Sequence, residues 1–571
     1  MFRKNLLAAA LLAGTSLGAQ AGTVTPLTNG LPFDGVIYGF QLTDGSLLFQ
    51  GGLLQDFYRF KPDRKGSYVN GTFFPAAALP PNYIPYATSG GVLPDGRVLL
   101  IGGEYLLESS PFNLVFSFTN KMAIYDPNAD TWTMVAPPSD PNSDDWAFIG
   151  DSPWTMLPNG HLLLGSKFTK AMAEFDPKTL RWTNVSSFAK DDVFAEEGLT
   201  LLPDGTVLTV NMTDFKFAQR FIPNANPSLT RWADAGATPE RLPATDSNSA
   251  KNIIFNNGMN VYHPPGEIGP GMLRPDGTVF WSGAACDVKG PPTQPSACVT
   301  YQPQAHTAVY DTKTGKWTAG PDIPTHEGAG DTWASLLPDG NVFMQTNPPG
   351  TNQDRLARAK ARYTSIRNHK LHPLAAAREA APGGFAPLAT ATCPPSLPLY
   401  KAYEFNGTSL IHEGAADFCG QPDLLLLPTG DVMMNGQLLY TGSGTFLHTW
   451  RPTITRFLYS NFVTPGGTYQ IFGTQFNGLS QANAFGDEFQ VSTNFPLVRI
   501  TNNATGDVSY ATTHDFSTMG VATGARIVST WFDVPTDLDI GDSKLEVVAN
   551  GIPSVPLPIT VVPGGAKAAS R

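Results

Sequence analysis

The chain is poor in charged residues and in long apolar runs, and it has no excess of basic residues. Only 15% of its 571 residues are charged, and the formal net charge is −11 at pH 7. Proteins that bind nucleic acids carry the opposite balance, so we expect no nucleic-acid partner. Beyond the N-terminus no apolar stretch is long enough to span a bilayer, so we expect no membrane span.

The N-terminus has the pattern of a cleaved secretory signal. Two basic residues precede an apolar run from Leu6 to Leu12, and the small-residue site Ala19-Gln20-Ala21 follows it. We therefore expect residues 1–21 to be removed and the mature protein to start near Gly22. The protein would then be secreted or periplasmic.

Cysteine is scarce, with four residues in the chain. Because an exported protein meets an oxidising environment, these four indicate two disulfides. The local pairing, Cys286 with Cys298 and Cys393 with Cys419, is the most economical of three possible connectivities. No pair has the close spacing of zinc ligands, so a structural role is preferred to a metal or thiol site.

Glycine and proline are abundant, with 56 and 50 residues, and they recur in one short phrase. The phrase is an apolar run, a Pro-Asp-Gly turn or a close relative, and a second apolar run. Proline presets the backbone, Asp or Asn bonds locally and glycine takes a positive φ, so each copy predicts a tight turn between two strands. The seven copies are Leu42-Thr43-Asp44-Gly45, Leu93-Pro94-Asp95-Gly96, Leu157-Pro158-Asn159-Gly160, Leu202-Pro203-Asp204-Gly205, Arg274-Pro275-Asp276-Gly277, Leu337-Pro338-Asp339-Gly340 and Leu427-Pro428-Thr429-Gly430.

The spacing of these turns, roughly 45 to 90 residues, is typical of a β-propeller with one four-stranded blade per repeat. In several repeats a strand ending in an aromatic residue leads through a polar turn to a strand that opens on tryptophan. We interpret these tryptophans as structural anchors, because every blade needs one. They are Trp132, Trp182, Trp232 and Trp317.

The propeller pattern covers residues 22–453, with a basic insertion at about 350–395 that we interpret as a solvated loop rather than an anion-binding lid. After Pro452 the turns disappear and short alternating strands predict an antiparallel, immunoglobulin-like domain at 454–563, followed by a tail at 564–571. The predicted fold class is all-β: a seven-bladed Kelch-type β-propeller followed by an immunoglobulin-like (E-set) β-sandwich.

This architecture resembles the galactose oxidase and glyoxal oxidase superfamily over nearly all of the mature chain. The resemblance implies a copper ion held by two tyrosines and two histidines, with one tyrosine cross-linked to a cysteine. Gly420-Gln421 stand where the Tyr-His pair would lie, and Glu196-Glu197-Gly198 stand where the cysteine would lie. Thr513-His514-Asp515 resembles the loop that reaches the copper. Because one histidine cannot hold a redox copper, copper is disfavoured and another divalent cation stays open.

A different motif repeats in place of these ligands. It reads His326-Glu327-Gly328-Ala329-Gly330-Asp331 in one blade and His412-Glu413-Gly414-Ala415-Ala416-Asp417 in the next. Segments that precede the innermost strands lie at the mouth of a propeller channel, so these side chains are expected to converge. The candidate catalytic residues are Glu327, Glu413, Glu197 and Asp331; the candidate ligand-binding residues are His326, His412, Asp151 and Glu267; the candidate metal ligands are His326, His412 and His514.

Clustered carboxylates and histidines indicate a divalent-cation site or an acid/base pair acting on a carbohydrate or another small polar substrate. The competing interpretation is structural, with each acid accepting backbone N–H groups from a neighbouring blade. The sequence leaves open a monomeric, exported carbohydrate-binding module, a hydrolase or lyase, a copper oxidase with a rearranged site, and a structural or adhesive cell-surface propeller. Among the enzymes, a hydrolase or lyase is preferred to a copper radical oxidase.

Overall fold

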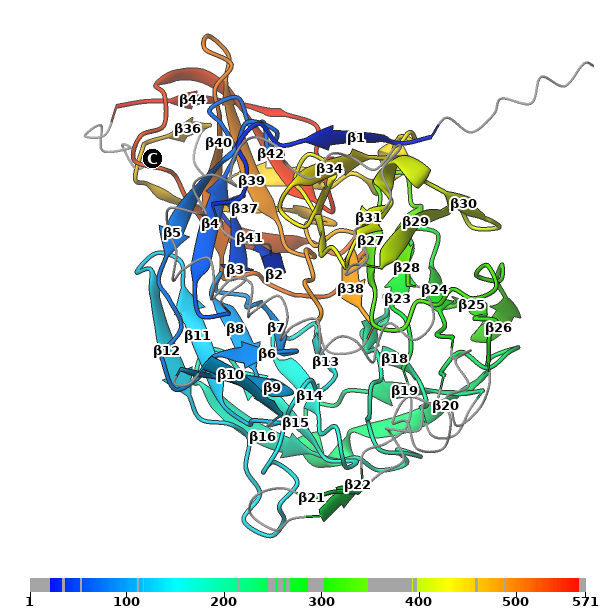
Figure 1. Ribbon diagram of the computed structural model, residues 1–571. Helices are drawn as coiled ribbons and strands as arrows, with labels where there is room; N and C mark the ends of the chain where they lie inside the picture. The colour runs from blue at the N-terminus through cyan, green and yellow to red at the C-terminus, as the bar shows by residue number, and fades with distance from the viewer. Residues whose placement is uncertain are drawn as a thin grey trace, which may run out of the picture.

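The molecule is a ring of β-sheets with a second all-β domain packed on one face (Figure 1). The computed structural model describes residues 21–32, 36–51, 54–109, 112–116, 118–212, 216–244, 252–254, 260–262, 267–285, 302–347, 393, 398–457, 461–486 and 489–563. The predicted Cys286–Cys298 pairing and C-terminal tail, and nearly all of the predicted signal and basic insertion, lie outside these residues.

Seven antiparallel sheets form the ring, six of four strands and one of six strands in which four make up the blade, and this confirms the seven-bladed propeller. The innermost strands, in order from blade 1 to blade 7, are β2 (Val36–Gln41), β7 (Ser89–Val92), β13 (Trp154–Met156), β17 (Thr200–Leu201), β23 (Gly271–Leu273), β27 (Trp333–Leu336) and β32 (Leu424–Leu426). The second strands are β3 (Leu47–Gly51), β8 (Val98–Ile101), β14 (Leu162–Gly165), β18 (Val207–Val210), β24 (Thr278–Ser282), β28 (Val342–Thr346) and β33 (Val432–Met434).

The third strands are β4 (Phe57–Lys61), β11 (Met122–Asp126), β15 (Met172–Asp176), β19 (Phe217–Ile222), β25 (Thr307–Asp311), β29 (Leu399–Phe405) and β34 (Leu438–Thr441). The outer strands are β5 (Thr72–Ala76), β12 (Thr131–Val135), β16 (Arg181–Val185), β20 (Arg231–Ala237), β26 (Lys316–Ala319), β30 (Leu410–His412) and β1 (Thr23–Pro26). Short accessory elements are β6 (Pro85–Tyr86), β9 (Tyr105–Ser109), β10 (Phe112–Phe116), β21 (Asn252–Ile254), β22 (Asn260–Tyr262), β31 (Phe418–Cys419), η1 (Pro227–Leu229), η3 (Gly414–Ala416) and η4 (His448–Trp450).

All seven predicted turns join an innermost strand to the second strand of its blade. In the first turn, the Gly45 N–H donates to the Leu42 carbonyl at 3.1 Å, and the other six turns repeat this bond. The seven turn glycines have φ between 72° and 90°, a conformation that strongly favours glycine. We call the face of the ring that carries these turns the turn face, and the opposite face, where the innermost strands begin, the start face.

The repeated tryptophans bind the preceding blade, as predicted. The Nε1 atom of Trp132 donates to the carbonyl of Ala77 at 2.9 Å, and that of Trp317 donates to the carbonyl of Ala235 at 3.0 Å. Trp182 makes the same kind of bond to a carbonyl that follows blade 2. Each indole therefore fills the space between two blades and satisfies its one polar atom there.

The first strand of the chain closes the ring. β1 pairs with β34 over four residues, from Thr23 opposite Thr441 to Pro26 opposite Leu438, so blade 7 combines three late strands with the earliest one (Figure 1). Closure in this way removes the free edge that the last blade would otherwise expose.

The C-terminal domain is a curved sheet folded over its own apolar core, as predicted for a sandwich. It contains one parallel pair, β36 with β44, where the sequence predicts only antiparallel strands. Its strands are β35 (Thr453–Phe457), β36 (Phe462–Val463), β37 (Thr468–Thr474), β39 (Leu497–Asn502), β40 (Val508–His514), β41 (Val528–Asp533), β42 (Gly541–Ala549), β43 (Ile552–Pro553) and β44 (Leu557–Val561).

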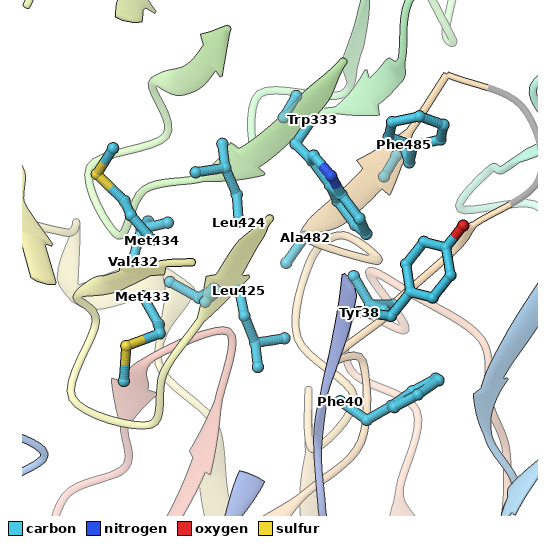
Figure 2. Packing of buried hydrophobic residues seen from close by; sticks show 14 of the residues in the cluster. Tyr38, Phe40, Trp333, Leu424, Leu425, Val432, Met433, Met434, Ala482 and Phe485 are labelled. Carbon is cyan, nitrogen blue, oxygen red and sulfur yellow. The ribbon is translucent and has the colours of Figure 1, made fainter. Parts of the chain in front are cut away.

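One segment of this domain enters the centre of the propeller, a feature that the sequence does not predict. We call residues 477–486 and 489–495 the plug segment. It contains β38 (Asn483–Phe485), which pairs with the innermost strand of blade 6, with Trp333 opposite Phe485 (Figure 2). The side chain of Gln481 reaches blades 3 and 4, accepting from the Leu201 N–H at 2.9 Å and donating to Thr155 at 2.9 Å.

The predicted pairing of Cys393 with Cys419 is confirmed, with the two Cα atoms 5.4 Å apart. The disulfide ties the start of β29 in blade 6 to β31. Within the described ranges, no helix has the length and apolar character needed to cross a bilayer.

Candidate functional site

The C-terminal domain packs on the turn face. The Thr513 N–H donates to the Thr43 carbonyl in the turn of blade 1 at 3.2 Å, and the Met519 N–H donates to the Pro158 carbonyl in the turn of blade 3 at 3.1 Å. Since the innermost strands run from the start face to the turn face, the segments that precede them lie at the other end of the ring.

A buried lysine neutralises two of the acids that precede blades 3 and 4. The Nζ atom of Lys167 lies 2.5 Å from Asp151 and also contacts Glu196, and its side chain has no exposed surface. Lys167 follows the second strand of blade 3, whereas Glu196 precedes blade 4, so the three charges join two blades. The structural interpretation of the sequence expected backbone N–H donors for these acids, whereas the structure pairs them with an ammonium group.

Glu197 belongs to a second buried cluster. Its carboxylate lies 2.8 Å from Lys190 Nζ and accepts from the Thr209 hydroxyl at 2.9 Å, while Asp192 lies 2.5 Å from the same ammonium group. Burial alone would lower the pKa of Lys190, but Glu197 and Asp192 outweigh it, so this pKa lies above its ordinary value. The ammonium group therefore stays charged between its two carboxylates.

Glu327 lies at the start face of blade 6, bonded to residues of its own blade. Lys401 contacts one carboxylate oxygen, and the other accepts from Thr346 at 2.8 Å and from the Tyr403 hydroxyl at 3.0 Å. Burial and the adjacent Glu327 raise the pKa of Tyr403 well above its ordinary value, so this phenol stays protonated.

His412 lies on the other side of Tyr403. The two rings are 5.1 Å apart, and the Nε2 atom of His412 lies 3.0 and 3.1 Å from the carboxylate oxygens of Asp417. The His412 side chain is 46% exposed, so solutes can reach it. The structure therefore brings His412 and Glu327 to one tyrosine.

Glu413, by contrast, points toward blade 7. It accepts from the backbone N–H of Gly22 at 3.0 Å and is 4% exposed. The two copies of the His-Glu-Gly-Ala motif are thus not equivalent in space. His326 lies twelve residues before Pro338, the proline of the next turn, whereas His412 lies sixteen residues before Pro428. The second copy therefore begins earlier relative to its turn and lies beside β29, on the outer strand of blade 6.

The other candidate residues lie on several different elements. His326 is exposed with a φ of 69°, and Asp331 is buried with a φ of 54°. Glu267 forms an isolated β-bridge with Ala244 between blades 4 and 5. His514 lies on β40, on the turn-face side, with Nδ1 2.9 Å from Asp515.

The described donors do not fit the copper site that the family resemblance implies. The segment that reaches into the channel is the plug segment, not the loop around His514, and its described residues include no histidine. No group of three or more His, Cys, Asp or Glu side chains among the described residues is arranged to hold a metal ion. We derive no chemistry through copper.

A polar cavity of about 360 Å³ opens on the start face of blade 3. The connection from blade 2 supplies one wall, with Asp140, Asp145 and Trp146, and the turn between β14 and β15 supplies Thr169 and Lys170. The rest of the lining comes from β15, β16 and the residues beside them: Ala171, Met172, Asn184, Val185 and Ser187.

Hydrogen bonds hold these groups in place. The Trp146 Nε1 donates to the Asn184 side-chain oxygen at 3.2 Å, and Ser143 donates to the Asp145 carboxylate at 2.8 Å. Lys170 donates to the carbonyl oxygens of Lys190 and Asp191 at 3.0 and 2.7 Å.

The sequence analysis missed both this cavity and the three counter-ion lysines. The long connection between blades 2 and 3 carries four aspartates, at positions 140, 144, 145 and 151, together with a tryptophan outside the repeated signature. This cluster of aspartates beside a tryptophan is the sequence feature that indicates the cavity. The lysines carry no such signal, because each stands among ordinary turn and strand residues.

The chain aligns with several solved structures at low sequence identity. No family model and no curated protein matches the sequence. A solved fungal alcohol oxidase of the AA5 family, in complex with copper, aligns over 95% of this chain and 99% of its own at 13% identity, with a TM-score of 0.40. A streptogramin B lyase aligns over 74% of this chain and 97% of its own at 11% identity, with a TM-score of 0.37. A virginiamycin B lyase from Staphylococcus aureus aligns over 73% of this chain and 97% of its own at 9% identity, with a TM-score of 0.36. These similarities concern the fold alone.

Proposed function

We propose that this protein is an exported propeller that binds a carbohydrate-like, small polar ligand in the blade 3 cavity. The cavity volume of about 360 Å³ falls within the range of roughly 300 to 1,000 Å³ that is common for ligand sites. The observation that carries the proposal is the polar part of the lining: two carboxylates, an amide and an ammonium group, whereas the indole of Trp146 is buried at 4% exposure. A polyhydroxylated ligand needs several donors and acceptors around its edge.

The acids that precede blades 3 and 4 favour a ligand site away from the channel mouth, because they are already paired with lysines. Asp151, Glu196 and Glu197 are saturated by Lys167 and Lys190 in the interior. Recruiting any of them to a ligand would take one of two carboxylate partners from a buried ammonium group, at a large cost. The cavity groups Asp140, Asp145 and Asn184, in contrast, are partly or fully exposed.

The binding proposal predicts that Asp145→Asn and Asn184→Ala weaken ligand binding at least about tenfold each, because each change removes a polar contact in the cavity. Isothermal titration of the protein with a panel of neutral, acidic and amino monosaccharides and short oligosaccharides measures this. Asp537→Asn, an exposed change in the C-terminal domain, is the matched control and should bind like the parent.

Two results would contradict this proposal. One is a sugar that binds equally well to the parent and to both cavity variants, which would place the site elsewhere. The other is a folded parent that binds no member of the panel at millimolar concentration.

A second candidate is a hydrolase or lyase acting at the pair of His412 and Asp417. The exposed imidazole, oriented by a carboxylate and stacked near the protonated Tyr403, has the parts of a general acid/base site. If the protein turns over a panel sugar, His412→Gln should lower kcat about 100- to 10,000-fold. Mass spectrometry of the reaction products measures turnover, and the exposed His448→Gln is the control. Unchanged kcat in His412→Gln would remove this candidate.

A further inference from the structure

Glu413 differs from the other buried acids of the repeated motif in the group that faces it. Glu196, Glu197 and Glu327 each contact a lysine, whereas none of the described lysines or arginines forms an ion pair with Glu413. Glu413 accepts from the backbone nitrogen of Gly22 at 3.0 Å, although Gly22 lies 391 residues away in the sequence, and it also lies near the Tyr440 hydroxyl, whose pKa it helps to raise. Burying a carboxylate without a cation costs free energy, so a positive charge on the Gly22 nitrogen would stabilise this contact.

We propose that removal of residues 1–21 turns the Gly22 nitrogen into an α-ammonium group that pairs with Glu413 and holds the closing strand β1 on blade 7. This inference rests on the proposed export. In the step, a signal peptidase hydrolyses the amide bond between Ala21 and Gly22. Water supplies the hydroxyl group to the Ala21 carboxyl product and a proton to the Gly22 nitrogen, which takes up a further proton from solvent.

The immediate surroundings of Gly22 require a residue without a side chain. A Cβ atom on Gly22 would lie 2.6 Å from the ring atom Cε2 of Tyr440, which is closer than real side chains come. Tyr440 cannot move aside, because it is fully buried, bonds to Glu404 and stacks on Phe343 with ring centres 4.1 Å apart. Glycine is therefore the residue that lets the backbone nitrogen come this near to Glu413.

The location explains what the ion pair would do. Gly22 immediately precedes β1, and Thr23 is the first residue paired with β34, opposite Thr441. Glu413 directly precedes η3, which lies against β1. The pair therefore bridges blade 6 to the end of the strand that closes the ring, where separation of β1 would begin.

Four recombinant chains test the proposal: one that begins at Gly22, the same chain with Gln20-Ala21 retained, and each of these two carrying Glu413→Gln. We expect thermal unfolding of the Gly22 chain about 2 to 5 °C above that of the extended chain. Retaining Gln20-Ala21 in the Glu413→Gln background should cause no such difference. Equal melting of the first two chains, or an equal difference in both backgrounds, would overturn the ion pair.

A second measurement covers the case in which a variant folds poorly. The rate of acetylation of the Gly22 α-amine, followed by mass spectrometry, should be at least several-fold slower in the parent than in Glu413→Gln, because a paired ammonium group is protected. Equal rates would overturn the proposal. Because these chains are produced without export, a negative result in the unfolding or the acetylation experiment would not contradict the proposed sugar binding or the proposed export. N-terminal sequencing of protein secreted from the full chain tests the cleavage site separately.

Discussion

Replacing Lys190 with methionine is expected to lower the free energy of unfolding by about 3 to 5 kcal/mol. The lysine lies in the connection between blades 3 and 4, and its ammonium group has no exposed surface. Asp192 and Glu197 would both remain in the interior after the change, and both would lose the ammonium group of Lys190. Removing one partner of a buried ion pair costs far more than the pair itself contributes.

Both carboxylates would keep a hydrogen bond from another described residue. Glu197 would keep its bond from Thr209, and Asp192 would keep the bond from the Met212 N–H at 3.1 Å. The lysine also lies 5.0 and 5.3 Å from the ring centres of Phe194 and Trp232, so its stem and charge contribute packing and cation–π contact as well.

Urea-induced unfolding followed by tryptophan fluorescence measures the effect. Lys178→Met, an exposed change in the polar turn of blade 3, should shift the unfolding midpoint little and serves as the control. Adding Glu197→Gln to Lys190→Met should recover part of the lost free energy of unfolding, because it removes one of the two buried negative charges that Lys190 neutralises. A loss below about 1 kcal/mol in Lys190→Met would show that the cluster is not a structural ion pair.

Phe489→Ala in the plug segment is the second change with a large expected effect, also about 3 to 5 kcal/mol. Phe489 is fully buried and stacks on Tyr38 of blade 1 with ring centres 3.9 Å apart. It also packs on Phe40 at 5.2 Å and on Trp333 of blade 6 at 5.6 Å. Truncation to alanine leaves a cavity bounded by two blades and by the segment itself.

The Phe489→Ala change should destabilise both domains. The plug segment joins blades 1, 3, 4, 6 and 7 through side chains and backbone, with Asn483 accepting from the Leu426 N–H at 3.0 Å in blade 7. We therefore expect the propeller and the C-terminal domain to unfold in one transition in the parent and at a lower urea midpoint in the variant. Calorimetry and fluorescence should agree on that midpoint.

Phe188→Ala is the matched control, because this side chain is 72% exposed in the connection between blades 3 and 4. It should change the free energy of unfolding by less than about 0.5 kcal/mol. A Phe489→Ala protein as stable as the Phe188→Ala protein would mean that the plug segment contributes little to holding the two domains together.

The sequence by itself determined the repeating elements of the molecule. Each turn depends on four or five neighbouring residues, so Gly45 and its six counterparts adopt a positive φ for reasons contained in the local chain. The alternating strands after Pro452 and the inter-blade tryptophans follow from the same short-range rules. Seven turns were enough to predict seven blades.

The tertiary structure decided which charges and aromatic groups meet. Two nearly identical motifs, around Glu327 and Glu413, were expected to converge at the channel mouth, but their different distances from the following turn place Glu413 at the edge of blade 7. Lys401 lies 74 residues from its partner Glu327, and the plug segment reaches blade 4 across 280 residues. Such contacts depend on how the ring closes and how the second domain packs on it, and no local pattern of residues records either.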